Sequence, residues 1–431
     1  MAGLDPAIHG PRIKSGGDEG IKMTEFYDAQ ETRSTDAREA ELFAALPGQV
    51  ALAKADSPAF ARLLADIDPA TVIDRAALAR LPVLRKSDLI DLQQADPPFA
   101  SLIAVPKGEL RRVFASPGPI YDPEGWDNDW WRIARALFAA GFRRGDLMHN
   151  CFSYHFTPGG VMFESGAHAL GCPVFPAGIG NTESQAKAVA DLRPAGYGGT
   201  PSFLKIILEK AEEMGLDHSS LTKACVSGEA LLPPLRQSLK DLGVDVTQCY
   251  ASADLGLIAY ETAAKDGLVV DEGVIVEIVR PGTNDPVAEG EVGEVVVTSF
   301  NPDYPLIRFA TGDLSAVMAG QSACGRTNMR LKGWMGRADQ TTKVKGMFIH
   351  PRQIADVARR HSEVIRARLV IDKVGEADTV ILSVESTAGG ESLASAIRDS
   401  FQTLCKLKAE VAFVAPGALP NDGIVIQDKR A

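Results

Sequence analysis

The sequence predicts an α/β fold with a large N-terminal domain of αβ layers, an appended antiparallel β part and a small α+β C-terminal domain. Helical and strand patterns alternate between Asp122 and Tyr250, which indicates right-handed βαβ crossovers and a parallel sheet with helices on both faces. After Glu261 the chain becomes rich in β-branched residues and turns. From Thr341 onward, strand and helix patterns mix in a third, shorter unit.

Composition and charge exclude several classes of function. The 431 residues suffice for two or three domains, and the net charge of -11 argues against binding to nucleic acid or to an anionic membrane. No apolar run approaches the length of a membrane span, and the N-terminus lacks the apolar core of a signal peptide. Six cysteines without a C-x-x-C pair favour a reducing compartment, so we expect a cytoplasmic protein without zinc or disulfides.

The N-terminal part is expected to be helical after an irregular start. Residues 1–22 are rich in glycine, proline and charge, so they are either a disordered leader or an over-called start before Met23. Apolar residues recur at helical steps from Phe26 to Leu64. The segment Leu81–Lys86 then predicts an extended entry to a short helix capped by Ser87.

The alternating region supplies the strands of the parallel sheet. Ligands of such sheets bind at the carboxyl ends of the strands, where Ser227–Glu229 and Tyr250–Ser252 fall. We expect strands at Leu147–Phe152, Cys172–Phe175, Gly196–Gly199 and Ala224–Ser227, and helices at Trp130–Gly141 and from near Thr182.

Two further regions follow, one after Glu261 and one from Thr341 onward. The region after Glu261 predicts an antiparallel sheet from Gly273–Val279 and Gly293–Thr298. We expect a large domain at residues 23–335, a small one at 336–431 and a hinge at 336–340. The small domain is predicted to contain helix Pro351–Arg360, strands Ala367–Ile371 and Thr379–Val384, helix Glu391–Leu404 and strand Glu410–Val414.

The stretch Tyr304–Leu314, Y-P-L-I-R-F-A-T-G-D-L, contains the first candidate site residue. Its apolar run, Pro305–Phe309, predicts a strand that stops at a Thr-Gly turn and presents the carboxylate of Asp313. A carboxylate in this position can accept two hydrogen bonds from a vicinal diol such as a ribose. An ordinary hairpin turn is the alternative that stays open at this point.

Other classes of site find little support in the sequence. The chain has no G-x-G-x-x-G after a strand, no G-x-x-x-x-G-K-[ST] and no G-x-S-x-G nucleophile elbow. Its seven histidines form no cluster with metal-ligand spacing.

Five motifs in order resemble those of the AMP-forming acyl/aryl-CoA ligases, and within that superfamily the phenylacetate-CoA ligases. They are F-A-S-P-G, S-G-E-A, Y-A-S-A-D-L-G, P-L-I-R-F-A-T-G-D and G-R-A-D-Q-T-T-K-V-K-G. The resemblance covers the chain from Glu25 onward. It implies that ATP activates a small-molecule carboxylic acid as an acyl-adenylate and that CoA then displaces AMP. It also implies Mg²⁺ at the phosphates, a mobile C-terminal domain that rotates between the steps, and a homodimer.

The resemblance assigns roles to residues of these motifs. Asp313 is expected to accept the ribose hydroxyls, with Arg337 as a second ribose or phosphate contact. Asp254 corresponds to the family's Mg²⁺-binding glutamate, so Asp254 and the hinge residue Asp339 are expected to act in catalysis. The adenine is expected to lie against Ser227, Gly228, Glu229 and Tyr250.

The segment Asn150–Gly160 resembles the wall of the family's acyl pocket. Phe152, Tyr154 and Phe156 would line this pocket, which suits a flat aromatic acid, and His155 would be a polar contact to the substrate. For the aromatic residues the alternative is core filling, and for His155 it is a satisfied interior histidine.

Two departures from the family weaken the expected phosphate site. The phosphate loop, roughly S-S-G-T-T-G-K-P in the family, reads S-P-G-P-I-Y-D-P from Ser116 to Pro123. Ser116 and Gly118 remain as nucleotide contacts, but both threonines are absent and Asp122 replaces the lysine, where a carboxylate repels phosphate. At the C-terminus, Ile424 stands where the family has the lysine that promotes adenylation.

Two functions are therefore predicted. The first is an AMP-forming aryl/acyl acid–CoA ligase with a degenerate phosphate loop. The alternative is a catalytically weak or inactive homologue that binds nucleotide or acyl ligand as a regulatory or partner protein.

Overall fold

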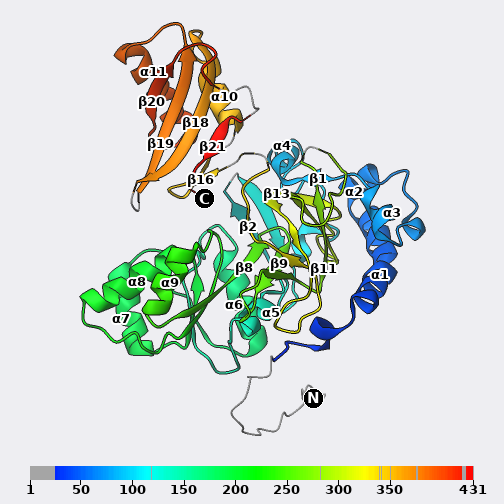
Figure 1. Cartoon of the computed structure of the whole chain (residues 1–431). Coiled ribbons are helices and arrows are strands. Elements are labelled where there is room, and N and C mark those ends of the chain that lie inside the picture. The colour runs from blue at the N-terminus through cyan, green and yellow to red at the C-terminus, as the bar shows by residue number, and fades with distance from the viewer. Residues whose placement is uncertain are drawn as a thin grey trace.

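The computed structural model describes residues 25–117, 119–281, 283–338, 340, 342–349, 351–374, 377–419 and 424–430. The predicted leader, residues 1–22, lies outside this part of the chain. Figure 1 shows a large αβ part and a smaller C-terminal unit. No helix of the described residues is long and apolar enough to span a membrane.

A nine-stranded sheet runs through the large part and confirms the predicted αβ layers. Its order is β14-β15-β10-β9-β8-β7-β6-β4-β5. The strands from β5 to β8 pair in parallel, and every pairing beyond β8 is antiparallel. The strands are β4 (Met148–Asn150), β5 (Val174–Phe175), β6 (Gly196–Gly199), β7 (Lys223–Val226), β8 (Asp245–Ser252), β9 (Gly256–Glu261), β10 (Leu268–Val270), β14 (Val317–Met318) and β15 (Arg330–Leu331).

Helices cover both faces of the parallel strands, as predicted. Side chains alternate across β7, so Ala224 and Val226 pack into one hydrophobic cluster while Cys225 between them packs into another. The first cluster includes α7 (Thr182–Leu192), α8 (Pro201–Glu213) and α9 (Pro233–Asp241), and the second includes α5 (Ile133–Ala139) and α6 (Gly159–Leu170).

A second sheet, in the order β1-β13-β12-β11, carries the Thr-Gly-Asp motif. The predicted turn after a strand at Pro305–Phe309 is wrong, because β13 begins at Phe309 and runs through the motif. Gly312 has a φ of 76°, which glycine adopts readily, and the register with β12 shifts here. The motif is therefore a bulge inside a strand. The strands are β1 (Leu84–Arg85), β11 (Val274–Val279), β12 (Gly293–Ser299) and β13 (Phe309–Ser315).

Short helices form the N-terminal region, and a hairpin follows them. The predicted cap at Ser87 is wrong, because Ser87 lies inside a 3-10 turn and the next helix begins without a side-chain cap bond. The hairpin consists of β2 (Arg112–Ser116) and β3 (Ile120–Glu124). The helices are η1 (Ala29–Thr32), α1 (Thr35–Asp56), α2 (Pro58–Leu63), η2 (Pro69–Thr71), α3 (Arg75–Ala79), η3 (Lys86–Asp88), α4 (Leu89–Ala95) and η4 (Lys107–Glu109).

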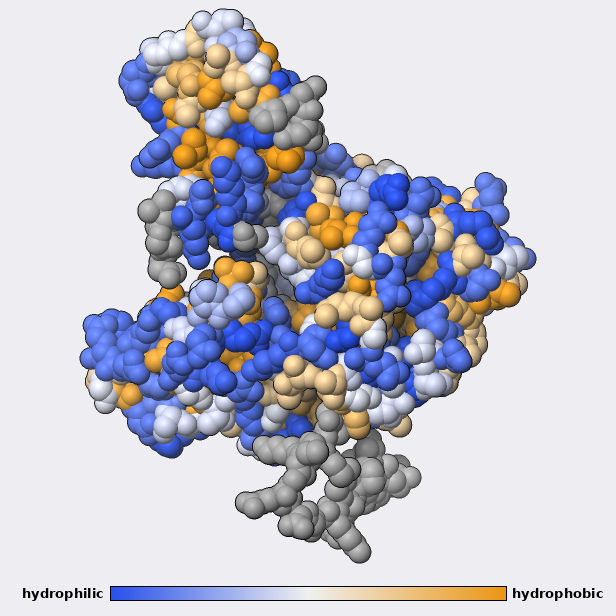
Figure 2. All heavy atoms as spheres, in the orientation of Figure 1, coloured by the Kyte–Doolittle hydropathy of each residue, from blue (hydrophilic) through white to orange (hydrophobic). Residues whose placement is uncertain are grey.

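The C-terminal unit has a hydrophobic core of its own, around Leu369, Leu382 and Phe401. Its sheet runs β20-β19-β18-β21, which gives the predicted α+β order with β21 added. Figure 2 shows a hollow between this unit and the large part on the viewed face. The elements are β16 (Thr342–Val344), β17 (Met347–Ile349), α10 (Pro351–Arg359), β18 (Val364–Val374), β19 (Ala377–Ser386), α11 (Glu391–Cys405), β20 (Glu410–Val414) and β21 (Ile426–Asp428).

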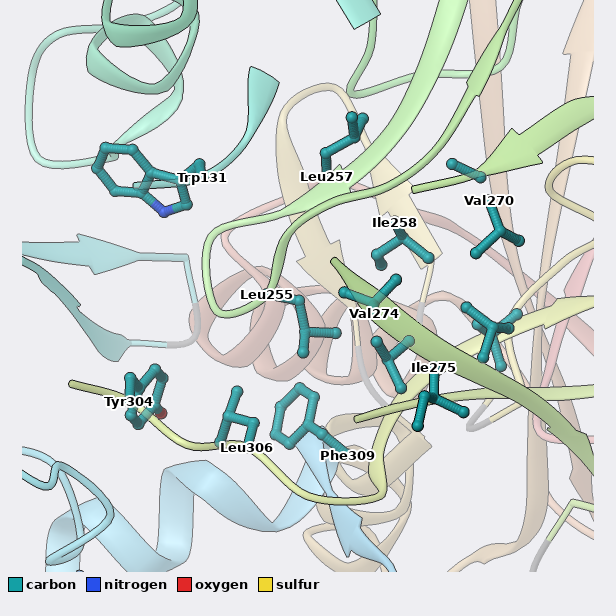
Figure 3. Close-up of a cluster of buried hydrophobic side chains, with 14 of the residues drawn as sticks. Trp131, Leu255, Leu257, Ile258, Val270, Val274, Ile275, Tyr304, Leu306 and Phe309 are labelled. Atoms are coloured by element: carbon teal, nitrogen blue, oxygen red, sulfur yellow. The ribbon is translucent and has the colours of Figure 1, made fainter. Parts of the chain in front are cut away.

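The main core lies where the two sheets of the large part meet. Figure 3 shows side chains from both sheets that fill it, among them Ile258, Val274 and Phe309, together with Leu255 and Leu306 from the segments that precede strands. Removing these apolar groups from water supplies the main driving force for folding. The Thr-Gly-Asp bulge begins directly after this core, so its backbone is held by packed neighbours.

Arg308 is fully buried beside this core. Its guanidinium donates to both oxygens of Glu277, at 2.9 and 3.0 Å. It also donates to the carbonyls of Ala79 and Leu81, at 2.8 and 2.6 Å, and of Asn284, at 2.9 Å. The φ of Arg308 is 47°, an unusual value for a side-chain-bearing residue that the surrounding bonds must maintain. Arg308 thereby ties β11 and the start of β13 to the chain that leads into β1.

We expect Arg308→Met to destabilise the fold strongly, because Glu277 would stay buried without a cation. Removing one partner of a buried ion pair costs about 3–5 kcal/mol. Chemical denaturation measures this loss, and adding Glu277→Leu should restore part of it. The control, Arg193→Met, removes an exposed ion pair with Asp217 and should leave the midpoint nearly unchanged. Equal midpoints for the Arg308 and Arg193 variants would contradict this role of Arg308.

Candidate functional site

Asp313 lies at the centre of a hydrogen-bonded group on the bulge of β13. Its Oδ2 accepts the hydroxyl of Tyr250 at 2.9 Å, and its Oδ1 accepts Nη1 of Arg337 at 2.8 Å and Nε1 of Trp334 at 3.1 Å. The hydroxyl of Thr311 also lies 2.9 Å from that of Tyr250. Burial and the charge of Asp313 raise the pKa of Tyr250, so its hydroxyl stays protonated as a donor. Three of the predicted nucleoside residues are therefore in direct contact.

The carboxylate of Asp313 has little acceptor capacity left. A carboxylate offers about four lone-pair sites, and Tyr250, Arg337 and Trp334 use three of them. A vicinal diol needs two, so the predicted ribose could bind here only if one of these donors left. Trp334 is the best candidate, because it is 44% exposed and has a single polar group. No motif predicted Trp334, although a tryptophan between T-G-D and G-R-A-D was a visible signal.

The predicted adenine segment follows β7, near the carboxyl end of β8. The hydroxyl of Ser227 donates to a β8 carbonyl at 2.9 Å. Gly228 has a φ of 82°, and a Cβ there would lie 3.7 Å from Phe152 of the predicted acyl wall. Glu229 accepts the amide of Ser202 at 2.6 Å and so fixes the segment to the start of α8. The structure thus places this segment beside the predicted acyl wall, and its contact with adenine stays a prediction.

A second polar group lies beneath the β2–β3 hairpin. Lys86 of η3 forms an ion pair with Asp254, whose side chain is fully buried. Ser116 at the end of β2 donates to Asp122 of β3, which is also fully buried. The hydroxyl of Tyr304 is buried beside the two carboxyls without a hydrogen-bond partner. Lys86 was not predicted, because it lies outside every motif of the sequence.

The hairpin is closed and leaves little room for a phosphate loop. Ser116 pairs with Ile120, so residues 117–119 alone join the two strands. The side chain of Asp122 was expected to face phosphates, but it is buried and accepts the hydroxyl of Ser116. The side chain of Lys86 lies beside Asp122 and Asp254 next to this hairpin.

Burial raises the pKa of Asp122 to about 8, and the neighbouring Asp254 adds to the rise. Asp122 is therefore protonated at neutral pH. Each of the two carboxyls has a buried Oδ1 without another hydrogen-bond partner, so one proton between them would satisfy both. Burial lowers the pKa of Lys86, but Asp254 and Asp122 outweigh this effect, so its pKa is raised and the ammonium stays charged. The group then carries no net charge.

The expected Mg²⁺ fits this group only as a partly coordinated ion. Among the described residues no cluster of three or more His, Cys, Asp or Glu side chains could hold a metal. Asp254 offers one oxygen that is not bound to Lys86, its Oδ1, and a metal ion there would replace the proton that Asp254 and Asp122 would otherwise share. Asp254 would therefore be a single protein ligand to an ion that arrives on a triphosphate. Such an ion would neutralise charge on the phosphate oxygens.

The predicted acyl wall lies along the start of α6. The ring of Phe152 packs against that of Phe163, with 4.4 Å between the centroids. The hydroxyl of Tyr154 accepts from Asn150 and donates to Glu164, both at 2.7 Å. Glu164, which no motif predicted, thus gives this aromatic wall a charged end.

Phe156 and His155 lie at the surface. Phe156 is 69% exposed, and its carbonyl accepts the amide of Ala115 of β2 at 2.9 Å. The ring of His155 packs edge-on against that of Phe156, 4.8 Å away. Their contact with an acid stays a prediction. The alternative of an interior histidine is therefore wrong for His155; among the described residues, His149 is buried and bonded to Gln185 at 2.6 Å.

Two predicted residues, Gly118 and Asp339, lie outside the described part of the chain. Ile424, at the position of the lysine expected from the resemblance, is described; it precedes β21 and is 38% exposed.

Comparisons with known proteins agree with this arrangement. A family model described as AMP-binding enzyme matches residues 129–301. The chain is 31% identical to the phenylacetate-coenzyme A ligase of Thermus thermophilus, over 82% of this chain and 84% of the relative. It is 29% identical to the phenylacetate-coenzyme A ligase of Aromatoleum evansii, with the same coverage.

The structure is similar to that of a 2-hydroxyisobutyryl-CoA ligase. In the thioesterification state, with 2-HIB-AMP and CoA, that ligase has a TM-score of 0.79 at 25% identity, over 95% of both chains. In the postadenylation state with 2-HIB-AMP the TM-score is 0.69, at the same identity and coverage. The arrangement of the parts thus agrees better with the first of these two states.

We expect Asp122→Asn to change how stability depends on pH. A raised pKa in the folded state means that the parent loses unfolding free energy as pH rises from about 4, the unfolded value, to about 8. Asparagine keeps the neutral form at every pH. In thermal unfolding from pH 5 to pH 9, the stability of the variant relative to the parent should therefore rise up to about pH 8 and stay constant above it. A constant difference across that range would contradict the buried, protonated state of Asp122.

Proposed function

Because the chain belongs to the phenylacetate-coenzyme A ligase family, we propose that it makes the coenzyme A thioester of a small carboxylic acid with ATP. A carboxylate oxygen attacks the α-phosphorus, which forms an acyl-adenylate and releases pyrophosphate. The thiol sulfur of coenzyme A then attacks the acyl carbonyl, and AMP leaves with the electron pair of the broken C–O bond. The contact of Asp313 with Tyr250 and Arg337 is the observation that supports this proposal most.

In this proposal Asp313 accepts the ribose hydroxyls once Trp334 has left. The indole N–H of Trp334 and the ribose hydroxyls are neutral donors, so replacing one with the other does not change the charge of the site. Tyr250 and Arg337 remain bound to the carboxylate and keep it in place. Such a site binds the nucleoside by replacing one hydrogen bond with two.

Lys86 would take the place of the lysine that the resemblance expects in the phosphate loop. Its side chain is 23% exposed, whereas that of its partner Asp254 is fully buried. Asp254 holds it in place, and a triphosphate would compete with Asp254 for it. A positioned donor of this kind is worth about 10²–10³ in rate. Lys86 therefore offsets the loss of the loop lysine in the proposed first step.

We propose a flat aromatic acid as the substrate, because Phe152 and Phe163 form a packed aromatic wall. The bond between Tyr154 and Glu164 adds polar groups, which suit a substituent that donates a hydrogen bond. A panel of acids should therefore include phenylacetate, hydroxylated aryl acids and a small hydroxy acid.

The second candidate function is nucleotide or acyl binding with little catalysis. The closed hairpin and the isoleucine at position 424 favour it, since both remove groups that act on the leaving pyrophosphate. It predicts normal binding of AMP together with negligible turnover for every acid.

Asp313→Ala should weaken AMP binding by about 10-fold or more, because two charge-assisted hydrogen bonds are lost. Trp334→Phe should strengthen it, because a competing donor is removed while the ring stays. Isothermal titration calorimetry with AMP measures both. The control is Trp126→Phe, whose exposed indole donates to the carbonyl of Glu109 instead. Unchanged affinity of the Asp313 variant would refute the ribose assignment.

Lys86→Met should lower the rate of acyl-CoA formation about 10²–10³-fold while AMP affinity changes little. The matched control is Lys187→Met, on the exposed face of α7. Acid-dependent exchange of pyrophosphate into ATP, run over the panel of acids, isolates the first step. Full exchange in the Lys86 variant would rule out its proposed role. Normal AMP binding with no exchange or thioester in the parent would favour the second candidate function.

A further inference from the structure

The segment that leads into the C-terminal unit is fastened to the nucleoside site on its N-terminal side. Arg337 forms a β-bridge and an ion pair with Asp313. The amide of Ala338 donates to the carbonyl of Gly312 at 2.6 Å, and that of Met335 to β13 at 2.9 Å. Residues 335–338 therefore run beside β13 and extend the second sheet.

Gln340 is fastened in the other direction, to the last strand of the chain. Its Oε1 accepts the amides of Val425 at 2.5 Å and Ile426 at 3.1 Å. The φ of Gln340 is 56°, which a side-chain-bearing residue rarely adopts without support. One side-chain oxygen thus holds two backbone amides at the start of β21.

The end of the chain is built firmly into the C-terminal unit. β21 pairs in parallel with β18. The hydroxyl of Thr342 donates to Asp428, and Arg430 donates to both of these residues. Residues 424–430 and 340–344 are therefore linked by several bonds, of which those of Gln340 lie nearest to the expected hinge.

We propose that Gln340 is a positioning residue that couples the hinge to the C-terminal tail, residues 424–430. The bonds of residues 335–338 belong to the nucleoside site. The side chain of Gln340 bonds to the C-terminal unit, while its amide donates to the carbonyl of Arg337 at 3.4 Å. Gln340 therefore bonds to both sides, and a change at Asp313 reaches the tail through Arg337 and Gln340. This inference rests on the proposed two-step function, in which the C-terminal unit rotates.

Gln340 suits this task because its acceptor is neutral and has two lone pairs. Both are used, one for each amide. Leucine fills similar space without an acceptor, so Gln340→Leu leaves two amides unpaired. Glutamate retains the acceptor oxygen, so Gln340→Glu should rescue the coupling.

The first test measures hydrogen exchange at the amides of residues 425 and 426 by mass spectrometry. Exchange should be faster in Gln340→Leu than in the parent and close to the parent in Gln340→Glu. Addition of AMP should change exchange of the tail in the parent, because AMP binds at the other attachment. In Gln340→Leu this response should be lost. If AMP leaves hydrogen exchange of the tail unchanged in the parent, the proposed coupling is refuted.

The second test separates the two chemical steps. Thioester formation from preformed acyl-adenylate should slow about 2- to 10-fold in Gln340→Leu, which is what one or two neutral hydrogen bonds are worth. AMP affinity should change by no more than the same factor, because coupling between two sites is reciprocal, and adenylate formation should stay at the parent value. The matched control is Gln353→Leu, which removes a bond to the carbonyl of Leu404 in the same unit. Its two steps should match the parent.

The outcomes distinguish this inference from the proposed function. Faster tail exchange with both chemical steps unchanged would mean that Gln340 is merely structural and would overturn the proposal. A parent that forms no thioester with any acid would refute the proposed function. In that case the AMP-dependent exchange of the tail alone decides the coupling.

Discussion

The buried ion pair of Arg308 and Glu277 is the contact on which both halves of the site depend. Arg308 precedes β13, which carries Asp313, and it binds the carbonyls of Ala79 and Leu81 on the way to Lys86. The pairing of β1 with β13 then continues this attachment. A buried ion pair adds little net stability, since both charges lose their water. Its main effect here is to fix two distant segments relative to each other.

The charged side chains of the site are paired with neighbouring groups of the protein. Asp313 is occupied by three donors, and Lys86 is paired with Asp254 beside a protonated Asp122. In the proposed function, nucleotide binding is therefore an exchange of partners, in which the indole of Trp334 gives way to the ribose. Exchange of this kind costs less than the burial of an unpaired charge. It also makes affinity depend on groups that never touch the reacting atoms.

Sequence patterns predicted what is local and missed what depends on distant pairing. The alternation that gave the parallel strands is a property of short segments, and the T-G-D and G-R-A-D motifs pointed to Asp313 and Arg337. The bulge at Gly312 depends on β12, so the sequence alone suggested a turn. Lys86 sits in an ordinary L-R-K-S stretch, and only the β1–β13 pairing brings it to Asp254. Burial of Asp122 likewise reflects the closed hairpin and not its local sequence.

In the proposed mechanism, Lys86 takes the place of the loop lysine, and this change affects the two chemical steps unequally. A lysine on an open loop can follow the departing pyrophosphate, whereas Lys86 is held by η3, by the β1–β13 pairing and by Asp254. A fixed donor needs no ordering during the reaction, which favours charge development at one place. It cannot track a leaving group that moves away. The second step releases AMP and no pyrophosphate, so its demands fall on Asp313 and on the hinge, where this chain keeps the family's residues. In the proposed mechanism, the loss of the loop lysine from the phosphate hairpin therefore lowers the rate of adenylation more than that of thioester formation.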